Sequence, residues 1–217
     1  MLRLKLGDAR QPLRRVLCLG AHCDDIEIGC GGTMLRLLKE NPQLQVCWVV
    51  FSSNHERAEE ARKSASMFLK GAKQPIVHIK NFRDGFFPFV GAEIKEFFEE
   101  LKGDFSPDIV FTHFRHDLHQ DHRLICELTW NTFRDHAILE YEIPKYDGDL
   151  GTPNFFVHLS DAHVRRKIGL LLKAFSSQRR KRWFTEDTFR ALMRLRGMES
   201  NSLSRFAEAY HARKVVA

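Results

Sequence analysis

The apolar run Arg15-Val-Leu-Cys-Leu-Gly20, followed at once by Ala21-His-Cys-Asp-Asp25, decides the fold of this chain. A run this short that stops at a glycine is typical of a strand buried on both faces of a parallel sheet. After a glycine cluster at positions 29, 31 and 32, Thr33 is predicted to cap a helix over residues 34–39. Strand, polar turn and helix in this order predict the start of a βαβ unit.

The same alternation of short apolar runs and longer amphipathic stretches continues along the chain. Further strands are predicted at residues 45–53, 75–80, 108–113, 138–143 and 155–160. Further helices are predicted at residues 56–70, 91–102, 121–133, 161–175 and 185–196. This order predicts a Rossmann-like α/β fold, in which an open, mostly parallel sheet has flanking helices. We expect one domain over residues 1–217, with a core at 14–160 and a helical C-terminal cap at 161–217.

Composition excludes several classes of protein. The chain has 217 residues, of which 43% are apolar, enough to bury one sizeable core. Five cysteines without a Cys-x-x-Cys pair argue against a disulfide scaffold and against a cysteine-rich zinc site. No apolar run approaches the ~20 residues that span a bilayer, and the N-terminal apolar stretch leads into a histidine and two aspartates rather than a cleavage site. A cytoplasmic protein is the resulting expectation.

The chain is basic, with a net charge of +6. Much of this excess comes from Gln178-Arg-Arg-Lys-Arg-Trp183, and the rest from scattered residues of the C-terminal third. No nucleic-acid-binding module accompanies these cations, so we expect no nucleic-acid partner. A basic surface that favours an anionic substrate is the preferred interpretation. The α/β core with its helical tail also leaves surface for a homo-oligomer.

Two polar clusters follow predicted strands at the points where those strands end. Gly20-Ala-His-Cys-Asp-Asp25 follows the first strand, and His113-Phe-Arg-His-Asp-Leu-His-Gln-Asp-His122 follows the fourth. Sites in open α/β sheets form at the carboxyl ends of strands, beside the crevice where the strand order reverses. We therefore expect the two clusters to meet.

The residue types in these clusters are those of a catalytic metal site. Imidazole and carboxylate ligands suit Zn²⁺ or Fe²⁺, and a catalytic site uses three protein ligands and leaves one position for water. Such a metal lowers the pKa of its bound water from ~15.7 towards ~7. A carboxylate that is not a ligand can then accept the proton, and a further acid protonates the leaving group. The clusters contain more ionisable residues than three ligands require, as a hydrolase needs.

Ala21-His-Cys-Asp-Asp-Ile-Glu-Ile-Gly-Cys-Gly-Gly-Thr33, paired with Arg115-His-Asp-Leu-His-Gln-Asp-His122, resembles the two motifs of the PIG-L/LmbE family of N-acetylglucosaminyl deacetylases. The family's motifs are usually AHPDD and HPDH. The resemblance extends to an Arg-x-x-Glu-Ala pattern at 57–61 and to Pro-Asn-Phe-Phe at 153–156, and more loosely to the ending at 206–211. It covers most of the first 160 residues.

The resemblance implies that His22, Asp25 and His122 hold a zinc ion, with Fe²⁺ as the alternative metal. It also implies an N-deacetylase, which hydrolyses the linear amide C–N bond of an N-acetylated amino sugar or sugar conjugate. The three ligands are the less diagnostic part of the pattern, because a non-haem Fe(II) oxygenase can share them.

The resemblance further implies roles for the residues left over. Asp24 is the expected general base. His119 is the expected imidazolium that stabilises the oxyanion and assists the departing amine. We expect Asp121 to orient His119, with Arg57 as a partner of Asp121.

Two residues depart from the family pattern. Cys23 and Gln120 stand where the family usually has proline, which removes a fixed φ from each turn. We expect the Cys23 thiol to be a spectator rather than a fourth ligand. His55, His158 and His211 are further candidates to reach the site, although each is more often an ordinary polar side chain.

Two other functions fit part of the pattern. A non-haem Fe(II) oxygenase shares the triad, but such enzymes are usually built on antiparallel barrels, in conflict with the alternating strands and helices. A non-catalytic binding protein would use the basic segment on an acidic partner or nucleic acid, and it leaves the spare acid and base residues unexplained. The sequence does not name the substrate.

Overall fold

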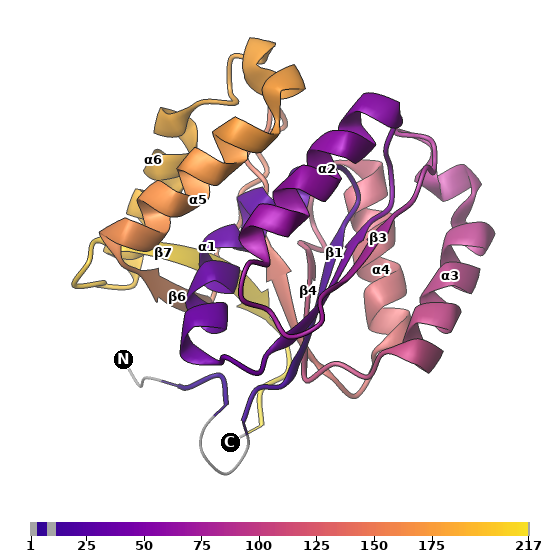
Figure 1. The fold of residues 1–217 in the computed structure, drawn as a ribbon, viewed down its shortest axis with the longest axis horizontal. Coiled ribbons are helices and arrows are strands. Elements are labelled where there is room, and N and C mark those ends of the chain that lie inside the picture. Colours follow the sequence, from indigo (N-terminus) through magenta and orange to yellow (C-terminus); the bar gives the residue numbers. More distant parts are fainter. Residues whose placement is uncertain (1–3, 8–11, 217) are drawn as a thin grey trace.

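One seven-stranded sheet organises the computed structural model, which describes residues 4–7 and 12–216 (Figure 1). Its order is β3-β2-β1-β4-β5-β7-β6, with the first five strands parallel and β7 antiparallel to both of its neighbours. The strands are β1 (Arg15–Gly20), β2 (Gln45–Val50), β3 (Ile76–Ile79), β4 (Ile109–His113), β5 (Ala137–Tyr141), β6 (Phe155–Leu159) and β7 (Phe206–Ala212). The predicted open, mostly parallel α/β sheet is confirmed.

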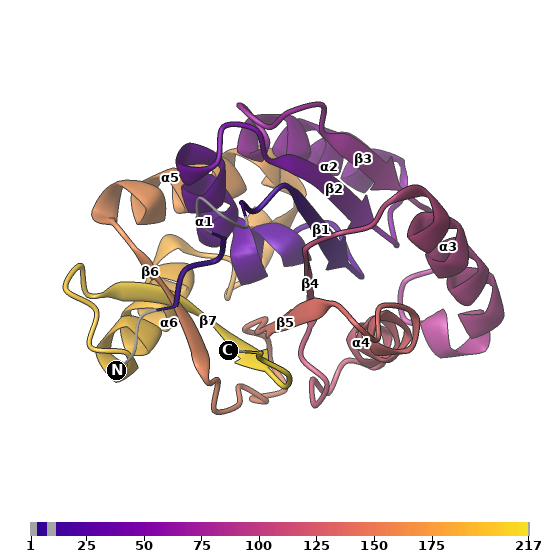
Figure 2. The ribbon, with the colours of Figure 1, turned by 90° about the horizontal axis from the view of Figure 1, so that it is seen from below.

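Helices cover both faces of this sheet and form two apolar cores (Figure 2). The helices are α1 (Asp25–Glu40), α2 (His55–Phe68), α3 (Gly91–Asp104), α4 (Gln120–Thr132), α5 (Asp161–Ala174) and α6 (Glu186–Glu199), with 3₁₀ turns η1 (Phe87–Phe89) and η2 (Ser176–Arg180). Residues of α1, α2, α5 and α6 share one core, and residues of α3 and α4 share the other. Among the described residues, no helix combines the length and the apolar character that a membrane span requires.

The strand order reverses direction at β1, which lies between β2 and β4. The chain moves outward from β1 through β2 to β3, then returns to β4 on the other side of β1. The connections after β1 and β4 therefore diverge and leave a crevice at the carboxyl ends of these two strands.

Helix α1 begins at Asp25, so the prediction that it starts after Thr33 was wrong. The glycine cluster lies inside the helix rather than in a loop. Glycine is a poor helix former, but here it permits close packing. A Cβ atom on Gly29 would overlap the Tyr141 ring of β5, and one on Gly31 would lie 2.8 Å from Phe68 of α2. The glycines thus let α1 lie against the sheet directly behind the first polar cluster.

Replacing Gly29 with alanine is expected to lower the free energy of unfolding by about 1–3 kcal/mol, because the new methyl group forces the buried Tyr141 ring to move. The same substitution at Gly169, an exposed position within α5 with open space around it, should raise stability by ~0.5–1 kcal/mol. Urea denaturation of both variants measures the difference. Equal stability of the two would show that α1 can shift away from β5 freely.

The C-terminal cap is not purely helical, because β7 enters the sheet between β5 and β6. This insertion was not predicted. The carboxylate of Glu208 on β7 is buried and accepts hydrogen bonds from the backbone N–H groups of Gly32 (2.8 Å) and Thr33 (2.6 Å) in α1. Lys167 of α5 pairs with the same carboxylate at 2.6 Å. These contacts hold β7 against α1, the helix that begins at the polar turn after β1.

Candidate metal centre

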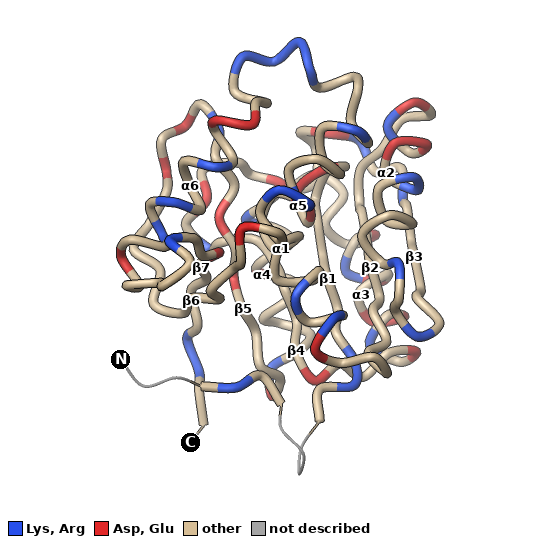
Figure 3. Tube along the Cα trace, turned by 60° about the vertical axis from the view of Figure 1, so that its left-hand side comes forward, with Lys and Arg blue, Asp and Glu red and all other residues tan. Residues whose placement is uncertain are grey.

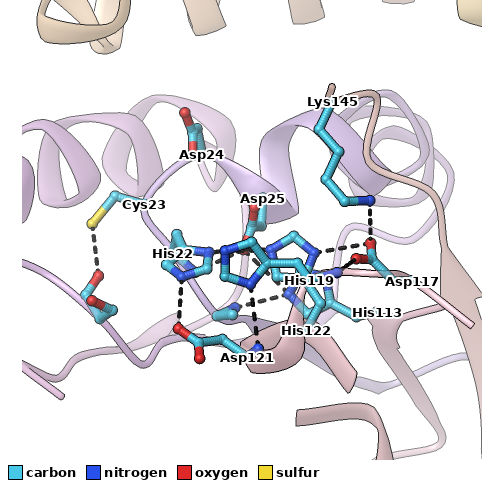
Figure 4. A network of polar contacts seen from close by, with 12 residues as sticks. His22, Cys23, Asp24, Asp25, His113, Asp117, His119, Asp121, His122 and Lys145 are labelled. Carbon is cyan, nitrogen blue, oxygen red and sulfur yellow. Dashed lines mark hydrogen bonds and ion pairs between the residues drawn. The ribbon is translucent and has the colours of Figure 1, made fainter. Parts of the chain in front are cut away.

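The two polar clusters meet at the carboxyl ends of β1 and β4, as predicted (Figure 4). In the turn after β1, the Ala21 N–H donates a 2.9 Å hydrogen bond to Nε2 of His113, the last residue of β4. Asp25 is the first residue of α1, and His122 lies in the first turn of α4. Two helix starts and two strand ends therefore converge on one point.

Three donor atoms from His22, Asp25 and His122 form a nearly equilateral triangle. Nδ1 of His22 lies 3.1 Å from Nε2 of His122 and 3.4 Å from Oδ2 of Asp25. Nε2 of His122 lies 3.5 Å from the same Oδ2. Tetrahedral zinc with ligands at ~2.0–2.2 Å needs donor atoms ~3.3–3.6 Å apart. The three residues therefore fit a zinc ion with a fourth position left open.

Outer carboxylates hold both imidazoles in the tautomers that such a site requires. Nδ1 of His122 lies 2.9 Å from Oδ2 of Asp117, so Nδ1–H donates there and Nε2 keeps its lone pair for the triangle. Nε2 of His22 lies 3.2 Å from Asp121 and 3.1 Å from Asp84, so Nε2–H donates to these carboxylates and Nδ1 is the nitrogen that faces the triangle. Carboxylate–histidine pairs of this kind orient ligands in metal proteins.

The pKa values of His22 and His122 are shifted in opposite directions. Burial lowers the pKa of His122 to about 3, so its ring is neutral, as a ligand must be. Burial alone would also lower the pKa of His22, but hydrogen bonds to Asp121 and Asp25 raise it well above its ordinary value. A metal ion bound here has to displace a proton from His22.

Two more histidines adjoin the triangle. His113, with Asp25 and His122, and His119, with His22 and His122, also bring donor atoms within 4.8 Å of one another. Nε2 of His113 already accepts the Ala21 N–H, and its ring is stacked against that of His122 with 3.9 Å between centroids. His113 is therefore better placed to support the centre than to bind the metal.

Asp24 lies next to a proposed ligand in a backbone conformation that is unusual for a residue with a side chain. Its φ is +127° and it is the N-cap of α1. Its carboxylate pairs with Arg57 at 3.1 Å and points away from the imidazole rings, on the opposite side of the cluster from Asp121 (Figure 4). Burial raises the pKa of Asp24 to about 7, although the charge of Arg57 opposes the rise.

The Asp121 carboxylate does not make the contacts expected for it. It faces Nε2 of His22 and accepts backbone N–H groups of Gly85 (2.7 Å) and Phe87 (3.1 Å), and it has no contact with Arg57. Arg57 instead joins the Asp24 carboxylate and the Cys23 carbonyl. The family resemblance implied that Asp121 orients His119, but the backbone N–H of Asp121 makes the contact with His119, whereas the Asp121 carboxylate faces His22.

His119 is the N-cap of α4, and its Nδ1 accepts a 3.3 Å hydrogen bond from the backbone N–H of Asp121. This contact puts the ring proton of the neutral form on Nε2. Burial and the nearby charge of His22 lower the pKa of His119. The lowered pKa disfavours the expected imidazolium, and a neutral ring in this contact carries its proton on Nε2.

A cleft of about 960 Å³ opens above the centre. It is lined by the three residues of the triangle, by Asp24 and His119, and by further residues that include Lys145, Tyr146, Lys181 and Trp183. His55, His158 and His211 do not line it. The His211 ring is stacked on Phe114 instead, with 3.8 Å between centroids.

Three residues that contact the centre, Asp84, Asp117 and Lys145, had no role in the interpretation of the sequence. The Asp117 carboxylate accepts a hydrogen bond from His122 and forms an ion pair with Lys145 at 3.0 Å. The sequence did offer one indication of this role, because Asp117 lies within the second cluster, five residues before His122. Asp84 and Lys145 come from loops far along the chain, and no local pattern marked them.

Comparison with known proteins identifies the family. A family model described as PIG-L, GlcNAc-PI de-N-acetylase, matches residues 17–133, more than half of the chain. The chain belongs to the PIG-L family. The matched range starts in β1, ends just after α4 and so contains both polar clusters.

Individual PIG-L relatives and solved structures agree with this assignment. The uncharacterized deacetylase YaiS of Escherichia coli (strain K12) is 30% identical over 142 residues, which cover 59% of this chain and 74% of YaiS. The conserved protein TT1542 from Thermus thermophilus has a TM-score of 0.75 at 21% identity, covering 93% of this chain and 96% of that one. N,N'-diacetylchitobiose deacetylase from Pyrococcus horikoshii has a TM-score of 0.69 at 20% identity, covering 92% and 84%. At these identities the two structures show the fold alone.

Cys23 and Gln120, which stand where PIG-L proteins usually have proline, make contacts outside the triangle. The Cys23 thiol is buried and donates to the Ser52 carbonyl at 3.3 Å, away from the triangle (Figure 4). Burial raises the pKa of this thiol to about 12, so it is protonated at neutral pH and is a poor ligand. The Gln120 side chain donates to the Gly85 carbonyl and so ties the start of α4 to the loop before η1.

Proposed function

We propose that this chain is a zinc-dependent hydrolase that removes the N-acetyl group from an amino sugar or sugar conjugate. The triangle of His22, Asp25 and His122 donor atoms at the floor of a large cleft carries the proposal. Membership of the PIG-L family supports it, because the family model is that of a de-N-acetylase. Fe²⁺ is the alternative metal, since imidazole and carboxylate ligands also suit iron.

A zinc ion held by the three residues would lower the pKa of water and polarise an acyl oxygen in the cleft. Asp117 and Asp121 keep the two histidines oriented for this purpose through the contacts at 2.9 and 3.2 Å. His22, Asp25 and His122 all line the cleft, where the substrate amide would enter.

Asp24 is the proposed general base. It lines the cleft, it adjoins the ligand Asp25, and it is not part of the triangle. Its carboxylate would take a proton from the water that attacks the acyl carbon and return that proton to the amine nitrogen as the C–N bond breaks. The products are acetate and a free amine. Arg57 fixes the carboxylate by the 3.1 Å ion pair.

His119 is the proposed hydrogen-bond donor to the oxyanion that develops on the acyl oxygen. Its Nδ1 is occupied by the Asp121 N–H, so Nε2–H is the free donor. A neutral imidazole at a helix N-terminus can act as an electrophile in this way without carrying a charge. Donation from a preorganised group in a partly buried cleft is the type of interaction that stabilises such an oxyanion.

The test is a screen of N-acetylated sugars, nucleotide sugars and lipid-linked sugars for acetate release by the zinc-loaded protein, with oxygen consumption recorded in parallel. We expect stoichiometric acetate and free amine with no oxygen uptake. Oxygen uptake without acetate would favour a non-haem Fe(II) oxygenase, which shares the ligand types. Binding of an acidic macromolecule that persists in His22→Ala, with no turnover of any sugar, would favour the non-catalytic alternative.

A further inference from the structure

Lys145 lies in the loop between β5 and β6, residues 142–154, and its ammonium group joins two carboxylates. Its Nζ lies 3.0 Å from Oδ2 of Asp117 and also contacts Oδ2 of Asp149, which lies in the same loop. The exposed fractions of the three side chains are 12% for Lys145, 3% for Asp117 and 6% for Asp149. Figure 4 shows Lys145 reaching Asp117 beside the imidazole rings. Two largely buried carboxylates therefore share one cation.

The Asp117 carboxylate is the point where this cation meets the metal centre. Its Oδ2, the atom that faces Lys145, also accepts the Nδ1–H of His122 at 2.9 Å. Asp149 binds the chain next to Asp117, because its Oδ2 accepts the Leu118 N–H at 2.7 Å. The ammonium group therefore joins the loop to a carboxylate that orients a proposed zinc ligand.

The tip of the loop, which we define as residues 144–150, forms part of the cleft wall. Tyr146 and Asp147 both line the cleft and both are exposed. The base of the loop has an anchor of its own, since Arg196 of α6 binds the Glu142 carboxylate at 2.6 Å. The contacts of Lys145 therefore hold the tip, whereas the base is held independently.

We propose that Lys145 is a positioning residue that couples zinc binding to the order of the loop tip. This inference rests on the proposed function only in taking His122 as a zinc ligand. An imidazole that binds a cation through Nε2 is a stronger hydrogen-bond donor at Nδ1–H, so zinc binding strengthens the contact with Asp117. Asp117 in turn holds Lys145 and, through it, the loop tip. Because such coupling is reciprocal, loss of the link at Lys145 weakens zinc binding.

The first test measures the zinc affinity of Lys145→Met by competition with a chromophoric chelator. We expect zinc to bind about tenfold more weakly, at the lower end of the ~10–100-fold cost of losing a partner that orients a metal ligand. Without their common cation, Asp117 and Asp149 repel each other and move apart, and His122 loses its acceptor. The sign of the change is decisive. If Lys145 acted through its charge alone, it would repel Zn²⁺, and its removal would tighten zinc binding.

A second substitution separates this repulsion from a loss of packing. Asp149→Asn removes one of the two carboxylates and leaves an amide oxygen that can still accept the Leu118 N–H. The double variant Lys145→Met/Asp149→Asn should therefore recover most of the zinc affinity that Lys145→Met loses. A purely structural role of Lys145 predicts a double variant that binds zinc as weakly as the single variant or more weakly, and that result would overturn the proposal.

Hydrogen exchange of the loop-tip amides gives a readout that involves neither substrate nor turnover. In the wild type, exchange at residues 144–150 should slow when zinc is added to chelator-treated protein, because local opening becomes rarer. In Lys145→Met, exchange there should be fast and should not respond to saturating zinc. The amides of β5, which precedes the loop, should exchange alike in both proteins. The wild-type part of this measurement does not depend on the folding of any variant.

Lys181 provides the matched control. It belongs to residues 179–182, which project from the molecule as a continuous blue stretch at the top of Figure 3, and it lines the same cleft. Its Nζ lies over the Trp183 ring, 5.6 Å from the centroid, rather than beside the triangle. Lys181→Met removes the same charge and should keep the wild-type zinc affinity and loop exchange. Equal losses in Lys145→Met and Lys181→Met would reduce the effect to the charge of the cleft and would overturn the proposal.

Two further results would overturn it. One is unchanged or tighter zinc binding in Lys145→Met, and the other is wild-type loop exchange that does not respond to zinc. A wild-type protein that binds zinc but releases no acetate from any sugar would count against the proposed function alone. A wild-type protein that binds no zinc would overturn both proposals.

Discussion

Replacing Asp24 with asparagine is expected to lower kcat for acetate release by about 10²–10⁴-fold, the range that a general base contributes. Asparagine is nearly isosteric, so the cleft keeps its shape, but the amide cannot accept the proton of the attacking water. Asparagine also tolerates a positive φ better than most residues, and the wild-type φ here is +127°. Arg57 keeps Glu60 as a partner at 3.0 Å. The zinc content should therefore stay at the wild-type level while turnover collapses.

A second cleft carboxylate provides the control for Asp24. Asp147 is exposed and lines the same cleft, so Asp147→Asn removes the same charge from a position without contacts to the centre. We expect kcat within a few-fold of wild type for this variant, because exposed charges interact weakly with their surroundings. Steady-state kinetics with metal analysis on both variants makes the comparison. Near-wild-type turnover in Asp24→Asn would contradict the assignment of the base.

Replacing His122 with alanine is expected to weaken zinc binding by more than about 100-fold, because loss of a direct ligand should exceed the ~10–100-fold effect of losing an outer partner. Activity at limiting zinc should fall with it. The zinc-free fold should persist, since Asp117 retains its ion pair with Lys145 at 3.0 Å. Ligand binding at ~100 times its Kd stabilises a protein by about 2.7 kcal/mol. Zinc should therefore raise the Tm of the wild type and leave that of His122→Ala unchanged at the same concentration.

His116 gives a matched control for this loss of an imidazole. It is exposed on the segment between β4 and α4, and its ring contacts Phe114 rather than the centre. The His116→Ala variant should bind zinc as the wild type does and should show the same zinc-dependent rise in Tm. Retention of zinc affinity by His122→Ala would remove His122 from the ligand set and favour His113 or His119 in its place.

The parallel sheet and the meeting of the two clusters could be predicted because both depend on local patterns. The run from Arg15 to Gly20 is apolar throughout its interior, as a strand buried on both faces requires. Polar residues at the ends of β1 and β4 then had to converge, since neighbouring parallel strands end at the same edge. Donor atoms of His22, Asp25 and His122 meet at this edge, and their role as metal ligands stays a prediction.

The parts that escaped prediction depend on contacts between distant residues. Glycines at 29, 31 and 32 were placed before a helix predicted to start after Thr33, but they lie within α1, where Gly29 and Gly31 pack against Tyr141 and Phe68. Strand β7 is formed by pairing with β5 and β6 and by burial of Glu208 against Lys167, and neither partner is close in sequence. The direction of the Asp121 carboxylate depends on backbone N–H groups of a loop more than 30 residues away. Contacts between residues so far apart leave no periodic pattern in the sequence.

The most direct test of a single zinc centre that hydrolyses an amide is titration of chelator-treated protein with Zn²⁺ while acetate release from the best N-acetylated sugar is measured. With His22, Asp25 and His122 as the only ligands, the rate should rise linearly with zinc and become constant at one equivalent per chain. The Asp24→Asn protein should bind the same equivalent and stay inactive. Acetate release that persists without metal, or that still rises between one and two equivalents, would contradict the account.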